Sequence, residues 1–212
     1  MQRADLIWLT VKGLCYWVLL SALGFWVGDQ LVTVFFPLAE LIVRFVSADF
    51  SPSLSVVGHG AEAHIQLSAW LTRPLPLDAH RAIPPGTELK SVQHVMHVLV
   101  PLVIVFSAVL AWPVKLWKER ACLLFAGSLA SVVVIGATLP FVLDGLLEIQ
   151  LLEMADRAGV SRAEPPVLQW LYFCEMGGSW ILAVVSALSC IALVSPLSKR
   201  WSKTGRVGQP TT

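Results

Sequence analysis

Long apolar segments dominate this chain, and their lengths predict how many of them cross a membrane. Three such segments lie in the second half of the sequence, at 92–112, 121–143 and 167–194. Each reaches or exceeds the roughly 20 apolar residues that a spanning helix needs. Their apolar residues form continuous runs rather than a stripe along one helical face, which is typical of helices surrounded by lipid. We therefore predict three spans in this part of the chain.

The first apolar region, from Leu6 to Val46, requires a different interpretation because of its length. A continuous helix over it would be about 60 Å long, about twice the thickness of the hydrocarbon core of a bilayer. We predict one span at 7–28, and residues 31–46 either continue that span or form an interfacial helix bent near Pro37. A cleaved signal peptide is the alternative, but Lys12 interrupts its apolar core and the following sequence stays apolar.

Basic residues at the ends of the spans predict the orientation, because lysine and arginine collect on the cytoplasmic side. The connection between the second and third spans is basic, and the N-terminus and the C-terminal tail carry further basic residues. These residues are Arg3, Lys12, Lys115, Lys118, Arg120, Lys199, Arg200, Lys203 and Arg206. With four spans, all three segments fall on one side, so both termini are predicted to be cytoplasmic. The outer loops are then 47–91 and 144–166.

The first outer loop contains an alternating segment that predicts a β-hairpin. Residues 63–72 alternate between apolar and polar positions, as in a strand with one buried face. Residues 53–57 also favour a strand, and Gly58 and Gly60 supply turn positions. In the second outer loop, an apolar face at helical spacing predicts that the third span continues to about Gly159. We thus expect an all-α membrane protein with four transmembrane helices, a small β-hairpin and a single membrane domain over residues 1–212.

Composition supports a membrane protein and argues against several other classes. Of the residues, 56% are hydrophobic and only 14% are charged, with a mean hydropathy of +0.73, whereas soluble domains carry about 25% charged residues. The net charge of +1 argues against a nucleic-acid partner. The four cysteines all lie within apolar segments without a CxxC spacing, which is typical of packing residues.

Ionisable residues at the outer ends of the predicted spans form the candidate site. His94, His97, Asp144 and Glu175 are expected to converge there, and Glu175 is the most informative because a carboxylate inside a span must find a partner. Two histidines with carboxylates suit a divalent metal such as zinc or iron. In the alternative interpretation these groups are solvated or structural. The same structural role is assigned to Asp29, Glu148 and Tyr172, and His59, His64 and His80 are expected to be ordinary surface residues.

Three segments carry a family resemblance. They are VFFPLAELIVRFV at 34–46, HVLVPLVIVFSAVLA at 97–111 and LYFCEMGGSWILAV at 171–184. In this layout the chain resembles the small membrane proteins encoded beside exosortase H, a bacterial protein-sorting enzyme. The resemblance is architectural and covers most of the chain, and it implies no catalytic residue. The chain does not resemble the exosortase itself, because no arginine accompanies Cys174 within a span.

These observations lead to three functional hypotheses. The first is a non-catalytic accessory subunit that binds another membrane protein in a bacterial envelope protein-sorting or export system, at the inner membrane and alongside an exosortase. The second is an intramembrane metal-dependent enzyme or metal-handling protein built on His94, His97 and Glu175. The third is a channel or transporter component, which would need an oligomer to form a pore.

Overall fold

The computed structural model describes residues 3–76, 82–114 and 116–204. Lys115, Arg206 and His80, which were considered above, lie outside the described residues. Helices make up most of this part of the chain, with a small sheet inserted between the second and third of them. The elements are α1 (Arg3–Thr33), α2 (Phe36–Val46), β1 (Phe50–Val57), η1 (Gly60–Glu62), β2 (His64–Leu71), β3 (Leu75–Pro76), β4 (Ala82–Ile83), β5 (Glu88–His94), α3 (Val95–Ala111), α4 (Trp117–Arg157), α5 (Val167–Phe173), η2 (Cys174–Gly178) and α6 (Ser179–Thr204).

Three helical segments are long and apolar enough to cross a membrane. They are Ile7–Thr33, Trp117–Arg157 and Val167–Ser195, and α3 is a shorter apolar helix of 17 residues. Their length and composition are those of membrane-spanning helices, which indicates a membrane protein. Two helix boundaries differ from those of the predicted spans. The first helix continues past residue 28 to Thr33, and the segment predicted to span from 92 begins as a helix only at Val95, because residues 92–94 complete strand β5.

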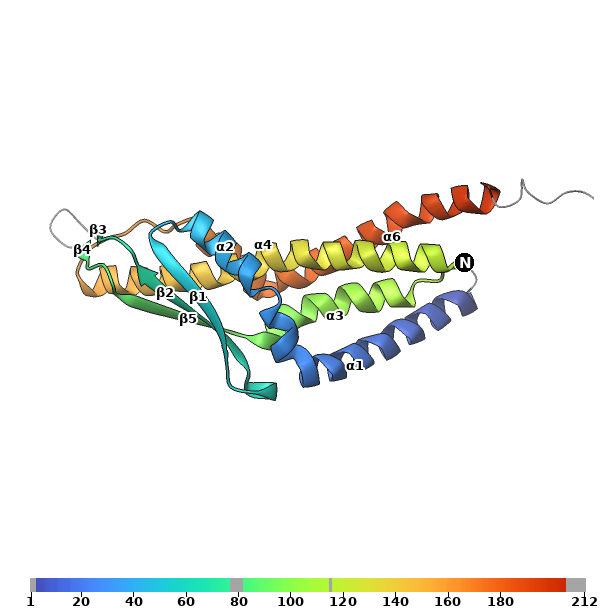
Figure 1. The fold of residues 1–212 in the computed structure, drawn as a ribbon, viewed down its shortest axis with the longest axis horizontal. Helices are drawn as coiled ribbons and strands as arrows, with labels where there is room; N and C mark the ends of the chain where they lie inside the picture. The colour runs from blue at the N-terminus through green and yellow to red at the C-terminus, as the bar shows by residue number, and fades with distance from the viewer. Residues whose placement is uncertain (1–2, 77–81, 115, 205–212) are drawn as a thin grey trace, which may run out of the picture.

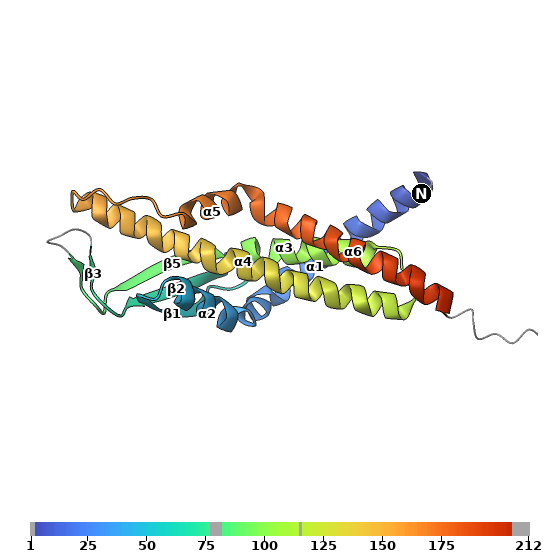
Figure 2. The same cartoon turned by 90° about the horizontal axis from the view of Figure 1, so that it is seen from above.

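The molecule is elongated, with a helical bundle at one end and the sheet at the other (Figure 1). Helices α1, α3 and α6 and the first half of α4 run along the bundle, where α3 packs against α1, α4 and α6. The N-terminal end of α1, the connection from α3 to α4 and the C-terminal end of α6 all lie at the end of the bundle away from the sheet (Figures 1 and 2). The three basic segments of the sequence are therefore on the same end of the molecule.

Helix α4 joins the two parts of the molecule. Its 41 residues make it about 60 Å long, which is about twice the thickness of a hydrocarbon core. Its second half supports the sheet on one side and the segment leading into α5 on the other (Figure 2). The predicted continuation of this helix toward Gly159 is confirmed. The helix ends at Arg157 and Gly159 has a φ of 72°, which favours glycine after a helix.

The predicted hairpin is confirmed, and the structure adds a third strand to it. Strands β1 and β2 pair in antiparallel register with Leu54 opposite Leu67, and β5 pairs antiparallel on the other side of β2, so the order is β1-β2-β5. The residues of β5 fall in the predicted first outer loop and at the start of the predicted second span. Strand β5 was missed because its pairing with β2 is a long-range contact, separated from β2 by a proline-rich segment.

One face of the sheet belongs to the hydrophobic core. Its side chains form one cluster with residues of α2, α3 and the second half of α4. The cluster includes Phe50, Leu54, Ile65, Leu67, Ala69, Leu71 and Leu89 of the sheet and Leu143, Leu147 and Leu151 of α4. The opposite face, which we call the outward sheet face, consists of Ser51, Ser53, Ser55 and Val57 of β1, His64, Gln66, Ser68 and Trp70 of β2, and Glu88, Lys90, Val92 and His94 of β5.

Helix side chains bond to the backbone of both edge strands. On β1, the backbone N–H of Leu54 donates to Oε1 of Glu40 in α2 at 2.7 Å. On β5, Nε2 of Gln150 in α4 donates to the carbonyl oxygen of Lys90 at 2.5 Å. Uncovered edge strands invite pairing with other chains, so these contacts help to keep the sheet at three strands.

Helix α2 corresponds to the predicted segment 31–46 and is a separate helix. A turn at residues 34–35 separates it from α1, and Pro37 lies in its first turn, where proline is tolerated. Its buried side chains, Phe36, Ala39 and Val43, join the core beneath the sheet. Helix α2 therefore packs on the protein and links the bundle to the sheet.

Close packing of α5 on α4 leads to a prediction about Gly145. A Cβ atom at Gly145 would lie 2.9 Å from Cβ of Leu171, whereas one at Gly136 would meet side-chain ends at 3.6 Å. We expect Gly145→Ala to lower the free energy of unfolding by about 1–3 kcal/mol, as overpacking does. Gly136→Ala is the control on the same helix and should have little effect or be slightly stabilising. Thermal unfolding of the two variants in detergent measures the difference, and equal midpoints would contradict the prediction.

Candidate functional site

The first part of the candidate site lies where β5 becomes α3. Gln93 and His94 end the strand, and His97 lies in the first turn of the helix. Nδ1 of His94 accepts a hydrogen bond from the backbone N–H of Met96 at 3.1 Å, so His94 caps the helix. His94 thus precedes the helix as its N-cap, and its ring centroid is 6.4 Å from that of His97.

The second part is a π-helical turn, Cys174–Gly178, between α5 and α6. Gly177 has a φ of 96°, and a Cβ atom at Gly178 would lie 2.4 Å from the ring of Phe173. Both positions thus require glycine for this backbone path. Turns of this kind within α-helices occur frequently at functional sites, and this one presents Glu175 to the end of β5.

Glu175 connects the π-helical turn to the junction of β5 and α3. Its Oε1 accepts a hydrogen bond from Nε2 of Gln93 at 3.2 Å and lies 4.0 Å from Nδ1 of His97. Of the two histidines expected near Glu175, His97 is the one beside it, at a distance longer than a hydrogen bond. A cleft of about 20 Å³ lies between these side chains, with Cys174 and Ser179 also in its wall. A volume of that size holds about one water molecule.

Two further histidines extend this group along the sheet. His64 and His94 are opposite each other in β2 and β5, with ring centroids 4.9 Å apart, and His94 is 6.4 Å from His97. Nδ1 of His64 lies 2.6 Å from the carbonyl oxygen of Glu62, so this nitrogen carries the proton in that contact. From the sequence, His64 is expected to be an ordinary surface residue and Gln93 to lie within the second span. Gln93 is a polar residue beside two histidines in an apolar segment, and this signal could have identified it.

Asp144 lies elsewhere, which corrects the predicted convergence of four residues. Its Oδ1 accepts a hydrogen bond from the Ser47 hydroxyl at 2.7 Å, beneath the sheet, and the side chain is buried. The reason is the helical period. Val142 and Leu139 of α4 line the cleft beside Glu175, and a residue two positions after Val142 points to nearly the opposite side of the helix.

The three residues assigned structural polar roles have different surroundings. Glu148, one turn after Asp144, lies 2.9 Å from Nη2 of Arg162 in the α4–α5 connection. Asp29, near the end of α1, lies 3.9 Å from Nδ1 of the exposed His59. Tyr172 is exposed on α5. None of these side chains lines the cleft.

Fewer side chains are placed to bind a metal than the four that were predicted from the sequence. In the part of the chain that the structure describes, no group of three or more His, Cys, Asp or Glu side chains is placed to hold a metal ion. Nδ1 of His94 is already occupied by the helix cap. His97 and Glu175 are beyond hydrogen-bond distance of each other, so what the arrangement can do is hold a small polar group, such as one water molecule, between them and Gln93.

Metal content and stability together test the role of His97. The pair with Glu175 is partly exposed on both sides, so we expect His97→Ala to change the free energy of unfolding by at most about 1 kcal/mol and to leave metal content unchanged. His59→Ala, which removes the other histidine near a carboxylate, is the control. A stoichiometric metal lost in His97→Ala and Glu175→Gln but kept in His59→Ala would contradict this expectation.

Comparisons with protein-family models, with curated proteins and with solved structures find no match for this chain. The class of protein therefore rests on the molecule itself, a helical membrane protein whose bundle carries a small antiparallel sheet.

Proposed function

We propose that the chain crosses the bacterial inner membrane four times, through α1, α3, α4 and the segment formed by α5 and α6. The three basic segments at one end of the bundle support a cytoplasmic position for both termini. The sheet is then on the outer side, supported by the half of α4 that extends beyond the hydrocarbon core. Helix α3, with 17 residues, is short for a span, at about 26 Å.

We propose further that the protein is a non-catalytic accessory subunit that binds a second membrane protein through the outward sheet face. The apolar side chains exposed on that face are the observation that supports this proposal. Val57, Trp70 and Val92 are 49%, 46% and 47% exposed among serine and glutamine side chains. Tryptophan is enriched among the anchors of binding surfaces, and the two valines add apolar surface to the same face. Glu40 and Gln150 bond to the two edge strands. A partner is therefore more readily bound on the face of the sheet than by adding a strand to its edge.

The resemblance to proteins encoded beside exosortase H suggests the system in which this subunit acts. The partner would be an exosortase or another component of an envelope protein-sorting or export pathway. A metal-handling role remains the second candidate, supported by the contact of His97 with Glu175.

Cysteine labelling tests the orientation. In a chain with Cys15, Cys122, Cys174 and Cys190 replaced by alanine, we expect Glu153→Cys, at an exposed position of the outer half of α4 away from the outward sheet face, to react with a membrane-impermeant maleimide in whole cells. Lys118→Cys should react only after the membrane is permeabilised. Ser189→Cys, on the apolar surface of α6, is the unreactive control. Labelling of Lys118→Cys in intact cells, or protection of Glu153→Cys there, would overturn the proposed orientation.

Site-specific crosslinking tests the docking surface. A photoreactive phenylalanine analogue at Gln66, in the centre of the outward sheet face, should crosslink to a co-expressed exosortase from the same genome. The same analogue at Trp117, exposed at the other end of the molecule, should not. Trp70→Ala should reduce the Gln66 product at least tenfold with unchanged membrane insertion, as expected for an interface anchor. Equal crosslinking from both positions, or none from Gln66, would count against this surface.

A further inference from the structure

Helix α2 exposes apolar side chains on the side away from the core, although two of its other sides already pack on the protein. Helix α2 crosses α4 where the bundle meets the sheet (Figure 1). Leu38 and Ile42 lie against α4, where a Cβ atom at Gly136 would meet them at 3.6 Å. On the outward side, Leu41 is 64% exposed and Phe45 is 89% exposed. Exposed apolar side chains that cluster in this way mark a surface that contacts a protein or a membrane.

The contacts of α2 with α4 determine its depth in the membrane. Gly136, beside Ile42, is 16 residues after Arg120, or about 24 Å along the helix. Ser47, which directly follows α2, donates its hydroxyl hydrogen bond to Asp144. Asp144 is 24 residues after Arg120, or about 36 Å. With Arg120 at the cytoplasmic surface, a hydrocarbon core of about 30 Å therefore ends at a level between the two ends of α2.

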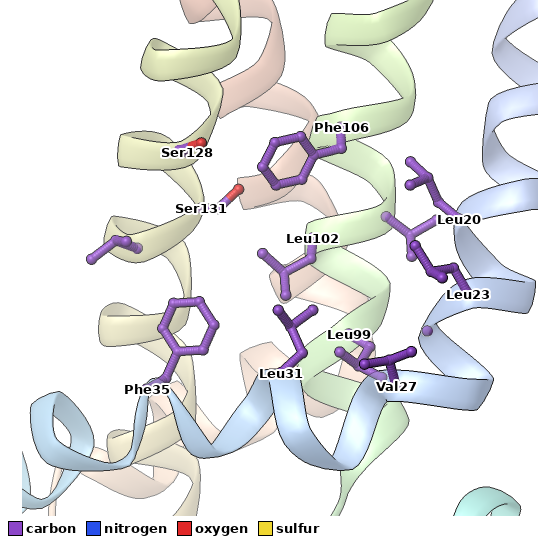
Figure 3. Close-up of a pocket in the computed structure, with 13 residues that line it drawn as sticks. Leu20, Leu23, Val27, Leu31, Phe35, Leu99, Leu102, Phe106, Ser128 and Ser131 are labelled. Carbon is purple, nitrogen blue, oxygen red and sulfur yellow. The ribbon is translucent and has the colours of Figure 1, made fainter.

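The start of α2 has the apolar surroundings of the bundle. Phe35, in the turn before α2, and Leu31, at the end of α1, line the same apolar groove as Leu102 of α3 (Figure 3). Val34 in this turn and Val133 on the adjacent part of α4 are exposed. The outward side of α2 thus continues the apolar surface of the spans.

The polar side chains of α2 lie toward the sheet. Oε1 of Glu40 accepts its hydrogen bond from the backbone N–H of Leu54 in β1, so this edge of the helix faces the sheet. Arg44 follows one turn later, in the last turn of α2, and is exposed. Within the described part of the chain, no carboxylate pairs with Arg44. At 100° per residue, Leu41 and Phe45 lie between this polar edge and the side that contacts α4.

On the basis of the four-span arrangement proposed above, we propose that α2 anchors the sheet in the outer leaflet of the membrane. Leu41 and Phe45 contact acyl chains at the edge of the hydrocarbon core, and the guanidinium of Arg44 binds phosphate groups of the lipid headgroups. The bilayer covers this face because its first turn lies within the depth of the hydrocarbon core and continues the surface of α4. Since β1 follows α2 after a short turn, the anchor fixes the height of the sheet above the membrane.

Spin labels on the purified full chain test this depth. The chain without its four native cysteines carries a nitroxide at Leu41→Cys or Phe45→Cys, in vesicles of phosphatidylethanolamine and phosphatidylglycerol. Collisions with oxygen, which concentrates in lipid, are compared with collisions with a water-soluble nickel complex. Leu188→Cys on α6 is the lipid control and Val57→Cys on the sheet is the aqueous control, and both positions are exposed. We expect the oxygen-to-nickel ratio to fall in the order 188, 41, 45, 57, with the two α2 positions at least threefold above Val57→Cys.

A charge reversal tests the contact of Arg44 with phosphate. Arg44→Glu should lower the oxygen-to-nickel ratio of the label at Phe45→Cys at least twofold, because phosphate repels the new carboxylate. Arg157→Glu, which reverses an exposed charge at the outer end of α4, is the matched control and should leave this ratio unchanged. An unchanged ratio in Arg44→Glu, or an equal change in both variants, would overturn the assigned role of Arg44.

The controls separate failure of the anchor from failure of the four-span arrangement. Ratios at Leu41→Cys and Phe45→Cys equal to that of Val57→Cys would place the outward side of α2 in water and overturn the anchor alone. Low collision rates with both reagents would show that a second copy of the chain covers this side, which also overturns it. An aqueous ratio at Leu188→Cys would overturn the arrangement of spans, and the anchor with it.

Discussion

Arg162→Ala is expected to lower the free energy of unfolding by about 3 kcal/mol, the lower end of the cost of leaving one member of a buried ion pair without its partner, because this pair is only partly buried. The side chains of Arg162 and Glu148 are only 27% and 14% exposed, and they lie 2.9 Å apart. Asp144, one turn earlier on α4, is also buried. Removing the guanidinium would leave two carboxylates on neighbouring turns without a cation between α4 and the α4–α5 connection.

A second ion pair on the same helix provides the control. Arg157 and Glu153 form an exposed pair at i,i+4 with 3.4 Å between Nη2 and Oε2, and Arg157→Ala should have a much smaller effect. The double variant Glu148→Gln/Arg162→Ala should recover part of the loss, because it removes the uncompensated charge. Thermal unfolding in detergent should show a midpoint lowered by about 10 °C for Arg162→Ala. Equal midpoints for Arg162→Ala and Arg157→Ala would show that the pair with Glu148 contributes no more than an exposed pair does.

Arg120→Ala should be the second most damaging substitution, at the opposite end of the molecule. The guanidinium of Arg120 donates to three carbonyl oxygens at the C-terminal end of α3. Nη1 lies 2.9 Å from that of Val109 and 3.1 Å from that of Leu110, and Nη2 lies 3.0 Å from that of Trp112. Carbonyl groups at the end of a helix have no partner within it, and a cation there also interacts favourably with the helix dipole. We expect a loss of roughly 2 kcal/mol, about that of a single hydrogen bond to a charged group, because Arg120 is only partly buried and water can replace its guanidinium at the other carbonyl groups.

Substitution of the neighbouring Lys118 distinguishes the contacts of Arg120 with α3 from the effect of removing a positive charge. Lys118→Ala removes the same charge from the same connection, but its side chain is exposed. We expect it to leave the unfolding midpoint nearly unchanged, and Arg120→Lys to recover only part of the loss because an ammonium group lacks the fork of donors. A midpoint for Lys118→Ala as low as that of Arg120→Ala would mean that net charge, rather than the contacts with α3, determines stability here.

Arg120 also shows how far a sequence argument reaches. Its position between two apolar segments marked it as a determinant of orientation, but nothing in the sequence indicated that it would bond to the end of the preceding helix. The candidate site was likewise only partly predictable from the sequence. Apolar surroundings singled out Glu175 and predicted a histidine partner. Its second partner, Gln93, depended on where β5 ends and α3 begins. The four-residue site was predicted as a whole, and Asp144 proved to lie on another side of α4.

The sequence by itself determined the membrane class, the apolar helices, the β1–β2 hairpin and the length of α4, because each depends on local composition or on a period of two or 3.6 residues. Only the tertiary structure decided that β5 completes the sheet, that α2 and α4 support it, and that Asp144 faces Ser47 rather than Glu175. These features are contacts between residues far apart in the chain. They depend on which surfaces pack together, and the local pattern of polar and apolar positions does not determine that packing.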